Sequence, residues 1–385
     1  MIILKLLFRN AFRHKLRSGL TILGVTIAIL AFGLLRTVIT AWHSGVEASS
    51  ATRLVTRNAI SLVFSLPLAY KDKIQQVQGV ACVSYGSWFG GVYIDRKNFF
   101  ANFAVEPQSY LELYPEFVFL PAEKEALLKD RKGFAAGKKL AAKYGWKIGD
   151  TVTLQGTIYP GNWDFVLRGI YKGRDRNVDE SQFFFHWSYL NEGLKKTVPR
   201  RADQVGFYMV GVARPDLSAQ VALDIDRTFK NSLAETLTET EKAFQQGFLA
   251  MSGALVLTIQ VVSIVIIFII MAVVANTMAM TTRERIGEYA VLKTLGFGWR
   301  HIAVLILGES LVMSLSGCIL GMALTFPVAG IFTHTLGTYF PIFYVEAKTL
   351  YLDIAAAVAV ATVAAMVPVR SAVGIRIADG LRRIG

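Results

Sequence analysis

The sequence predicts a membrane protein with four transmembrane helices and a large α+β domain inserted between the first helix and the second. Three observations lead to this fold class. Hydrophobic residues make up 53% of the 385-residue chain and charged residues only 18%, whereas in soluble domains about a quarter of all residues are charged. The apolar residues gather in four long runs. Between the first two runs, residues 42–250 alternate strand, helix and turn signals.

Residues 1–17 are predicted to form an amphipathic helix along the cytoplasmic membrane surface. Leu4, Leu7, Phe8 and Ala11 recur at helical spacing, and basic residues separate them. A cleaved signal peptide is the competing interpretation. It is disfavoured because the basic region and the apolar run after it are both longer than signal peptides usually have.

Each of the four apolar runs is long enough to cross a bilayer, whose core of about 30 Å needs about 20 helical residues. The predicted spans cover residues 18–41, 251–280, 302–334 and 350–369. The third span is long enough to tilt, or to contain a break near Pro327.

The distribution of charge predicts the orientation of the chain. The net charge is +13, and most of the excess lies beside the apolar runs. Basic and acidic residues number five and none in 1–17, four and two in 281–300, four and one in 370–385, and 26 and 22 in 42–250. Since basic residues mark cytoplasmic flanks, both termini (1–17 and 370–385) and the segment 281–301 are expected in the cytoplasm. Residues 42–250 and the loop 335–349 are expected outside, and no nucleic-acid partner is expected.

The block 42–250 is predicted to be an α+β domain that ends in a helical stalk. Helices are expected near 68–78, 121–129 and 135–145. A last helix over 216–251 is expected to continue without a break into the second span. The aromatic run at 183–190 is expected to pack in the core of this domain rather than line a ligand site.

Sequence motifs for catalysis, nucleotide binding and metal binding are weak. The stretch GFAAGKK at 133–139 has three residues between its glycines and a second lysine where a phosphate-binding loop needs serine or threonine. The two cysteines, Cys82 and Cys318, do not form a disulfide framework, and the histidines are scattered. The chain is therefore expected to be no enzyme, with no cofactor, metal or nucleotide of its own.

A few polar and small residues inside the spans stand out. Glu309 lies early in the third span, where a carboxylate is costly, and it is expected to have either a functional or a packing role. Asp353 lies near the outer end of the fourth span and is expected to reach the membrane interface. Gly317 and Gly321 form a small-xxx-small pattern that permits close approach of another helix.

A short charged segment separates the second and third spans. Residues 283–295 are expected to form a helix of about three turns, with Arg285 and Glu288 spaced as a pair on one face. Gly296 is expected to end this helix. The segment is either a surface helix that caps a turn or a contact helix for a cytoplasmic partner.

This segment resembles the signature of the FtsX-like permease family of ABC transporters, of the MacB or type VII mechanotransmission kind. The residues that carry the resemblance are Arg283, Glu284, Ile286, Gly287, Leu292, Lys293, Leu295 and Gly296. Glu309 matches an acidic residue that the family has early in its third span. Residues 10–29 and 368–382 resemble the two ends of the family's membrane region.

The resemblance implies an inner-membrane permease of a bacterial cell, with residues 42–250 as a MacB-like periplasmic core domain. It implies a separate cytoplasmic ABC ATPase that binds ATP, a second permease chain and membrane lipid as partners. A periplasmic adaptor or lipoprotein is a further partner that it leaves open. The matching residues, with Arg285 and Glu288 between them, would then couple the permease to the ATPase.

The expected function is to transmit ATP-driven movement to the periplasmic domain, which exports or extracts a lipoprotein, lipid, peptide or drug. The alternative is a signalling or scaffold protein that activates a periplasmic cell-wall hydrolase without moving a substrate. An ion-coupled carrier fits poorly, because the spans show no inverted repeat and little room for a midplane site.

Overall fold

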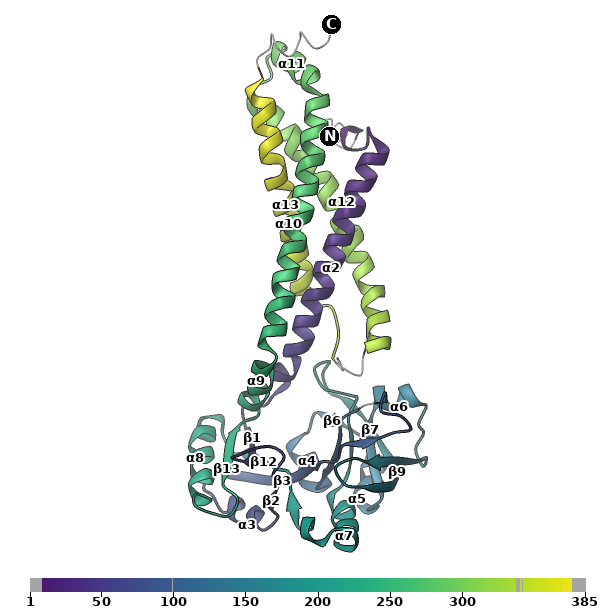
Figure 1. Cartoon of the computed structure of the whole chain (residues 1–385), viewed down its shortest axis with the longest axis vertical. Helices are drawn as coiled ribbons and strands as arrows, with labels where there is room; N and C mark the ends of the chain where they lie inside the picture. The colour runs from purple at the N-terminus through teal and green to yellow at the C-terminus, as the bar shows by residue number, and fades with distance from the viewer. Residues whose placement is uncertain (1–8, 99, 337–339, 341, 376–385) are drawn as a thin grey trace. The chain divides into compact units, whose positions relative to one another are not determined.

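The structure, a computed structural model, describes residues 9–98, 100–336, 340 and 342–375. These residues form two compact units, drawn in Figure 1. The helical unit contains the residues up to Ala41, residues 253–336 and those from Phe343 onward. The sheet-rich unit contains residues 42–252 together with Phe340 and Ile342.

Long helices build the helical unit. They are α2 (Lys15–Ala48), α10 (Gly253–Glu284), α12 (Trp299–Leu336) and α13 (Ala347–Gly374), with the short α11 (Ile286–Thr294) between α10 and α12. In the described part of the chain, the four long helices are the ones long and apolar enough to cross a membrane. The four apolar runs of the sequence are therefore confirmed as helices of that kind.

Two details of the predicted helices differ from expectation or fall outside the structure. Helix α12 passes through Pro327 without interruption, so the break near this proline, one of the two alternatives for the third span, is not present. The amphipathic helix predicted over 1–17 falls partly on residues 1–8, which lie outside the described residues, and α2 begins at Lys15.

The glycine pattern of α12 packs against α2 of the same chain. A Cβ atom added to Gly317 would lie 2.6 Å from Cβ of Val25, and one added to Gly321 would lie 2.9 Å from Cβ of Ile29. Such distances leave no room for a side chain, which is how small residues bring membrane helices together. The small-xxx-small pattern is thus used within one chain.

The four helices are covered by their own chain to different extents. Within its most apolar stretch, α12 has 50% of its residues buried, whereas α10 has only 17%. On α13, small residues such as Ala357, Ala361 and Ala365 are fully buried in the core of the helical unit. Helix α12 therefore occupies the interior of the unit, and α10 leaves most of its apolar surface open.

The sheet-rich unit is built on an 11-stranded mixed sheet in the described part of the chain. Its strand order is β13-β1-β12-β3-β5-β10-β7-β9-β8-β4, with β6 paired to β9, and β11 pairs separately with β2. The strands are β1 (Arg53–Asn58), β2 (Leu66–Pro67), β3 (Val80–Trp88), β4 (Gly91–Val92), β5 (Asn102–Val105), β6 (Phe117–Val118), β7 (Gly133–Gly137), β8 (Thr151–Gly156), β9 (Gly161–Gly173), β10 (Phe183–His186), β11 (Gln204–Val205), β12 (Phe207–Val212) and β13 (Thr236–Thr240).

Seven α-helices accompany this sheet in the described residues of the unit. They are α3 (Tyr70–Gln75), α4 (Pro107–Leu113), α5 (Pro121–Lys129), α6 (Lys138–Tyr144), α7 (Trp187–Thr197), α8 (Ser218–Thr228) and α9 (Glu241–Met251). The aromatic run predicted for the core is confirmed, because Phe183, Phe184 and Phe185 on the central strand β10 are at most 1% exposed. Their alternating side chains pack on both faces of the sheet.

The continuous helix predicted over 216–251 is wrong. The chain forms α8, then strand β13, then α9, which ends at Met251 and is separated by one residue from α10, which begins at Gly253. The stretch TLTET of β13 alternates β-branched residues, and Thr236 and Thr238 are buried beside β1. Pairing with β1 therefore outweighs the helical tendency of the flanking residues.

Candidate functional site

The charged segment between α10 and α12 folds as a short helix closed by a glycine. Helix α11 ends at Thr294, and Gly296 has a φ of +89°, a backbone conformation that residues other than glycine rarely adopt. The amide of Phe297 donates to the carbonyl of Leu292 at 3.0 Å, and that of Gly296 donates to the carbonyl of Lys293 at 3.1 Å. This pair of bonds is a Schellman motif, and the predicted helix end at Gly296 is confirmed.

The acidic residues of the segment bind arginines from the beginning of the chain. Both carboxylate oxygens of Glu284 accept hydrogen bonds from the guanidinium of Arg17, each at 2.8 Å. Glu288 accepts from Arg13 and, at 2.8 Å, from Arg285. Arg13 and Arg17 are therefore held against the segment by a shared carboxylate and a bidentate pair, respectively.

Arg285 joins the segment to the interior of the helical unit. Its guanidinium donates to Glu309 on α12 at 2.8 Å, and the side chains of the two residues are 10% and 4% exposed. Burial alone would lower the pKa of Arg285, but Tyr289 and the carboxylates of Glu288 and Glu309 raise it. Glu309 is thus the buried counter-ion of an arginine that stays charged.

Lys293 ties the same segment to the end of α13. Its ammonium donates to the carbonyl of Val373 at 2.9 Å and to that of Ile375 at 2.7 Å. Carbonyl groups at a helix end have no partner within the helix, so a cation there satisfies them and interacts favourably with the helix dipole. The segment therefore contacts α2 through Glu284, α12 through Arg285 and α13 through Lys293.

The predicted coupling residues fall into three groups in the structure. Glu284, Arg285, Glu288 and Lys293 are engaged in pairs within the chain. Arg283, Leu295 and Gly296 are exposed, whereas Ile286, Gly287 and Leu292 are half-buried. The turn after α11 carries further exposed side chains that the sequence analysis did not single out. We call Leu295, Phe297, Trp299 and Arg300 the exposed turn, in which Leu295 is 70% and Trp299 59% exposed.

Asp353 does not reach the interface, contrary to the prediction. It is fully buried, and neither of its carboxylate oxygens has a hydrogen-bond partner among the described residues. Its Oδ2 lies 3.3 Å from the position of a Cβ atom on Gly33 of α2. The absence of a side chain at Gly33 therefore makes room for this carboxyl group between α2 and α13.

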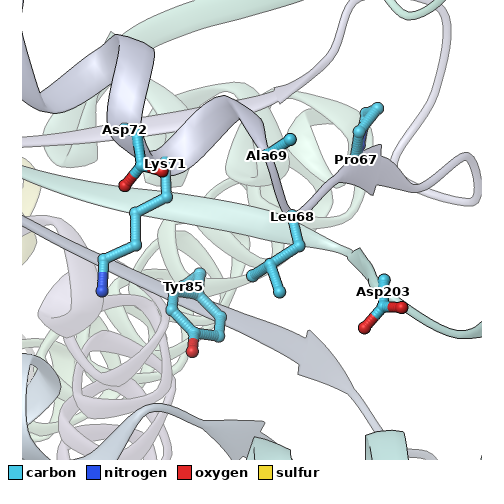
Figure 2. A pocket seen from close by; sticks show the side chains of 7 residues that line it. All are labelled: Pro67, Leu68, Ala69, Lys71, Asp72, Tyr85 and Asp203. Carbon is cyan, nitrogen blue, oxygen red and sulfur yellow. The ribbon is translucent and has the colours of Figure 1, made fainter.

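The sheet-rich unit has a separate surface pocket, shown in Figure 2. Its volume is about 450 Å³, and its lining residues are Pro67, Leu68, Ala69, Lys71, Asp72, Tyr85 and Asp203. The ammonium of Lys71 lies 5.3 Å from the ring centroid of Tyr85, and Asp203 pairs with Lys195 at 3.0 Å. Asp203 and Lys195 neutralise each other, and no three His, Cys, Asp or Glu residues among those described could hold a metal.

Comparison with known families identifies the region that contains the segment. Residues 260–377 match the family described as FtsX-like permease C-terminal. The chain carries an FtsX-like permease domain. The matched residues include most of α10 and all of α11, α12 and α13, so Glu284, Arg285, Lys293 and Glu309 all lie in the FtsX-like domain.

A curated relative extends the similarity beyond the FtsX-like domain. The chain is 24% identical over 339 residues to an uncharacterized ABC transporter permease of Methanocaldococcus jannaschii. The aligned region covers 82% of this chain and 81% of that protein. This similarity supports a permease subunit of an ABC transporter.

Two solved structures are similar to about half of the chain. One is the extracellular domain of the noncanonical ABC-type transporter YknZ from Gram-positive bacteria, with 11% identity, a TM-score of 0.36, and coverage of 49% of this chain and 100% of that one. The other is a domain of a protein named as a permease in Porphyromonas gingivalis, with 13% identity, a TM-score of 0.33, and coverage of 49% and 90%.

The Lys293 contact gives a first prediction for the FtsX-like domain. Lys293→Met is expected to loosen the last turn of α13, because hydrogen bonds to a charged donor contribute about 1.5–3 kcal/mol. Hydrogen exchange of the amides of residues 368–374 should become faster while the middle of α13 stays unchanged. Lys348→Met, at the exposed start of α13, is the control. Equal exchange in the two variants would show that the Lys293 contact does not hold this helix end.

Proposed function

We propose that the chain transmits the movement of a separate cytoplasmic ABC ATPase to its sheet-rich unit, with α11 and the exposed turn as the docking surface. The observation that carries this proposal is the division of the segment into an engaged side and a free side. The charged residues bind α2, α12 and α13, so displacement of α11 would pull on all three helices. The exposed turn remains available for a partner.

The composition of the exposed turn suits a protein partner. Leu295, Phe297 and Trp299 are large apolar side chains that lie close together in the chain and stay exposed. Aromatic and arginine side chains contribute most of the binding energy at protein interfaces. Arg300 lies over the ring of Trp299, with 5.4 Å between its guanidinium carbon and the ring centroid. An apolar knob with a basic edge is suited to a groove on a soluble protein.

The remaining parts of the proposal rest on the distribution of charge along the sequence and on the similarity to FtsX-like permeases. Both termini and the exposed turn lie in the cytoplasm, the sheet-rich unit lies in the periplasm of a bacterial cell, and the inner membrane surrounds the four long helices. Two permease chains pair, and α10 offers the largest uncovered apolar surface for such a contact or for lipid. The substrate is a lipoprotein, lipid, peptide or drug that the periplasmic unit handles.

The docking surface can be tested by co-purification with the ATPase subunit. The double variant Leu295→Asp with Trp299→Ala is expected to reduce ATPase recovery on the purified permease at least about tenfold, since two lost interface anchors cost more than about 1.4 kcal/mol. The measurement is the ATPase to permease ratio after affinity purification from membranes, together with ATP hydrolysis by the complex.

The control is Ile319→Ala, because Ile319 is 63% exposed on α12, away from the exposed turn. The complex of this variant should match the wild type. Recovery and coupled hydrolysis that survive the double variant would refute docking at the exposed turn. A variant that binds the ATPase normally but abolishes activation of a cell-wall hydrolase, with no substrate moved, would favour the signalling alternative.

A further inference from the structure

Arg53 occupies an unusual position in the sheet-rich unit. It is the first residue of β1, and its side chain is only 8% exposed. Its Nε donates to Glu241 at 2.8 Å, and its Nη1 lies 2.8 Å from Glu116 and donates to the carbonyl of Leu113 at 3.0 Å. The guanidinium also lies 4.2 Å from the ring centroid of Tyr114. We call Arg53, Tyr114, Glu116 and Glu241 the Arg53 cluster.

Glu241 uses both of its carboxylate oxygens in this cluster. Oε2 accepts from Arg53 and, at 2.9 Å, from the backbone amide of Ser50, and Oε1 accepts from the hydroxyl of Tyr114 at 3.0 Å. Glu241 is also the first residue of α9, where a carboxylate is favoured by the helix dipole. Thr240 caps the same helix by accepting from the amide of Ala243 at 3.1 Å. The beginning of α9 is therefore fixed by side chains from other segments.

The cluster joins three segments that are distant in sequence. Ser50 lies two residues after the end of α2, and α9 is separated from α10 by Ser252 alone. Tyr114 and Glu116 belong to the link between α4 and β6, and β6 pairs with β9 in the second half of the sheet. The guanidinium of Arg53 thus connects the beginning of α9, and through Glu241 the segment that follows α2, with the part of the sheet built on β9.

The energetics make this junction rigid. Burial alone would lower the pKa of Arg53, but the neighbouring Glu241, Tyr114 and Glu116 raise it, so the arginine stays charged. Removal of one partner from a buried ion pair leaves an uncompensated charge and is strongly destabilising. Separation of α9 from β1 would break the pair of Arg53 with Glu241 and carry this penalty. These segments are therefore expected to move together rather than slide.

We propose that the Arg53 cluster is the joint through which displacement of α2 and α9 reaches the whole sheet-rich unit, with Arg53 and Glu241 as positioning residues. This inference rests on the proposed function, because it assumes that ATP-driven movement arrives along those helices. It adds the site where that movement enters the sheet. Loss of the cluster uncouples the link 113–118 from the helices and leaves the ATPase docking surface intact.

The test compares hydrogen exchange of the full permease–ATPase complex in lipid nanodiscs without nucleotide and after trapping with ATP and vanadate. In the wild type, trapping is expected to change exchange both in residues 281–302 and in residues 113–118. In Arg53→Met the difference between the two states should persist in 281–302 and disappear in 113–118. A merely structural role would raise exchange in both states and keep their difference.

The matched control is Arg57→Met, because Arg57 lies on the same strand and pairs with Glu239 of β13 in a more exposed position, at 3.4 Å. It should behave as the wild type. Glu241→Gln preserves the shape of the side chain, so it replaces Arg53→Met if that variant does not fold. A difference in 113–118 that persists in Arg53→Met or Glu241→Gln would overturn the joint alone. A wild-type complex whose sheet-rich unit does not respond to nucleotide would overturn the proposed function as well.

Discussion

Replacement of Gly317 by leucine is expected to prevent stable packing of α2 against α12. Even a Cβ atom at this position would lie 2.6 Å from Cβ of Val25 and 2.9 Å from the carbonyl oxygen of Ile22. The backbone oxygen cannot move aside as a flexible side chain could, so the two helices must separate. Overpacking of a well-packed core typically costs about 1–3 kcal/mol, and a clash with backbone is expected at or above the upper end.

The measurement is the thermal unfolding midpoint of the purified protein in detergent, together with the fraction that elutes as a single species. Gly317→Ala should already lower the midpoint, and Gly317→Leu should lower the yield of folded protein. Gly330→Ala on the same helix is the control, because no side chain or other segment among the described residues lies within 4 Å of a Cβ added there. Equal stability of the Gly317→Ala and Gly330→Ala proteins would contradict the close contact of α2 with α12.

The two buried carboxylates of the helical unit are expected to respond in opposite directions to the same chemical change. Glu309→Gln should destabilise the protein by about 3 kcal/mol, the lower end of the cost of breaking a buried ion pair, because Arg285 keeps Glu288 as a second partner. Asp353→Asn should leave stability unchanged or increase it. Asp353 has no hydrogen-bond partner to lose in the part of the chain that the structure describes, and an amide is less costly to bury than a charge.

Thermal unfolding of the two variants side by side at pH 7.5 checks this prediction. Arg285→Met provides a second measurement of the same ion pair, and its effect should not add to that of Glu309→Gln, since residues that share a partner are coupled. A stable Glu309→Gln protein would show that the Arg285 pair contributes little. A strongly destabilised Asp353→Asn protein would show that Asp353 has a partner that the described residues do not include.

Local patterns in the sequence predicted the helices and their ends well. Apolar runs give the four long helices, and Gly296 ends α11, because both signals depend on neighbouring residues. The partners of charged residues were beyond such reasoning. Arg17 and Glu284 are 267 positions apart, and the basic residues of the first segment were explained by membrane topology alone. Their pairing is decided by how α2 approaches α10, which is a property of the packed helices.

Two further differences have related causes. The alternation of threonine in TLTET was a strand signal that the surrounding helical residues concealed, and it becomes decisive only beside β1. Asp353 was expected at the interface because carboxylates avoid membranes, but the space left by Gly33 accepts it inside the helical unit. In both cases a distant segment supplies the environment that determines the outcome.

The long helices differ in how much of their surface is buried, and this difference predicts how freely the sequence of each helix can change during evolution. On α12 half of the most apolar stretch is buried, and Gly317 and Gly321 lie against the backbone of α2. Selection is therefore expected to act on the size of these side chains as well as on their hydrophobicity. On α10 only 17% is buried, so exchanges among valine, isoleucine, leucine and phenylalanine leave most of its surroundings untouched. The sequences of orthologues should therefore diverge quickly along α10 while its residues stay hydrophobic. A conserved face on this helix would mark the surface that contacts a second chain.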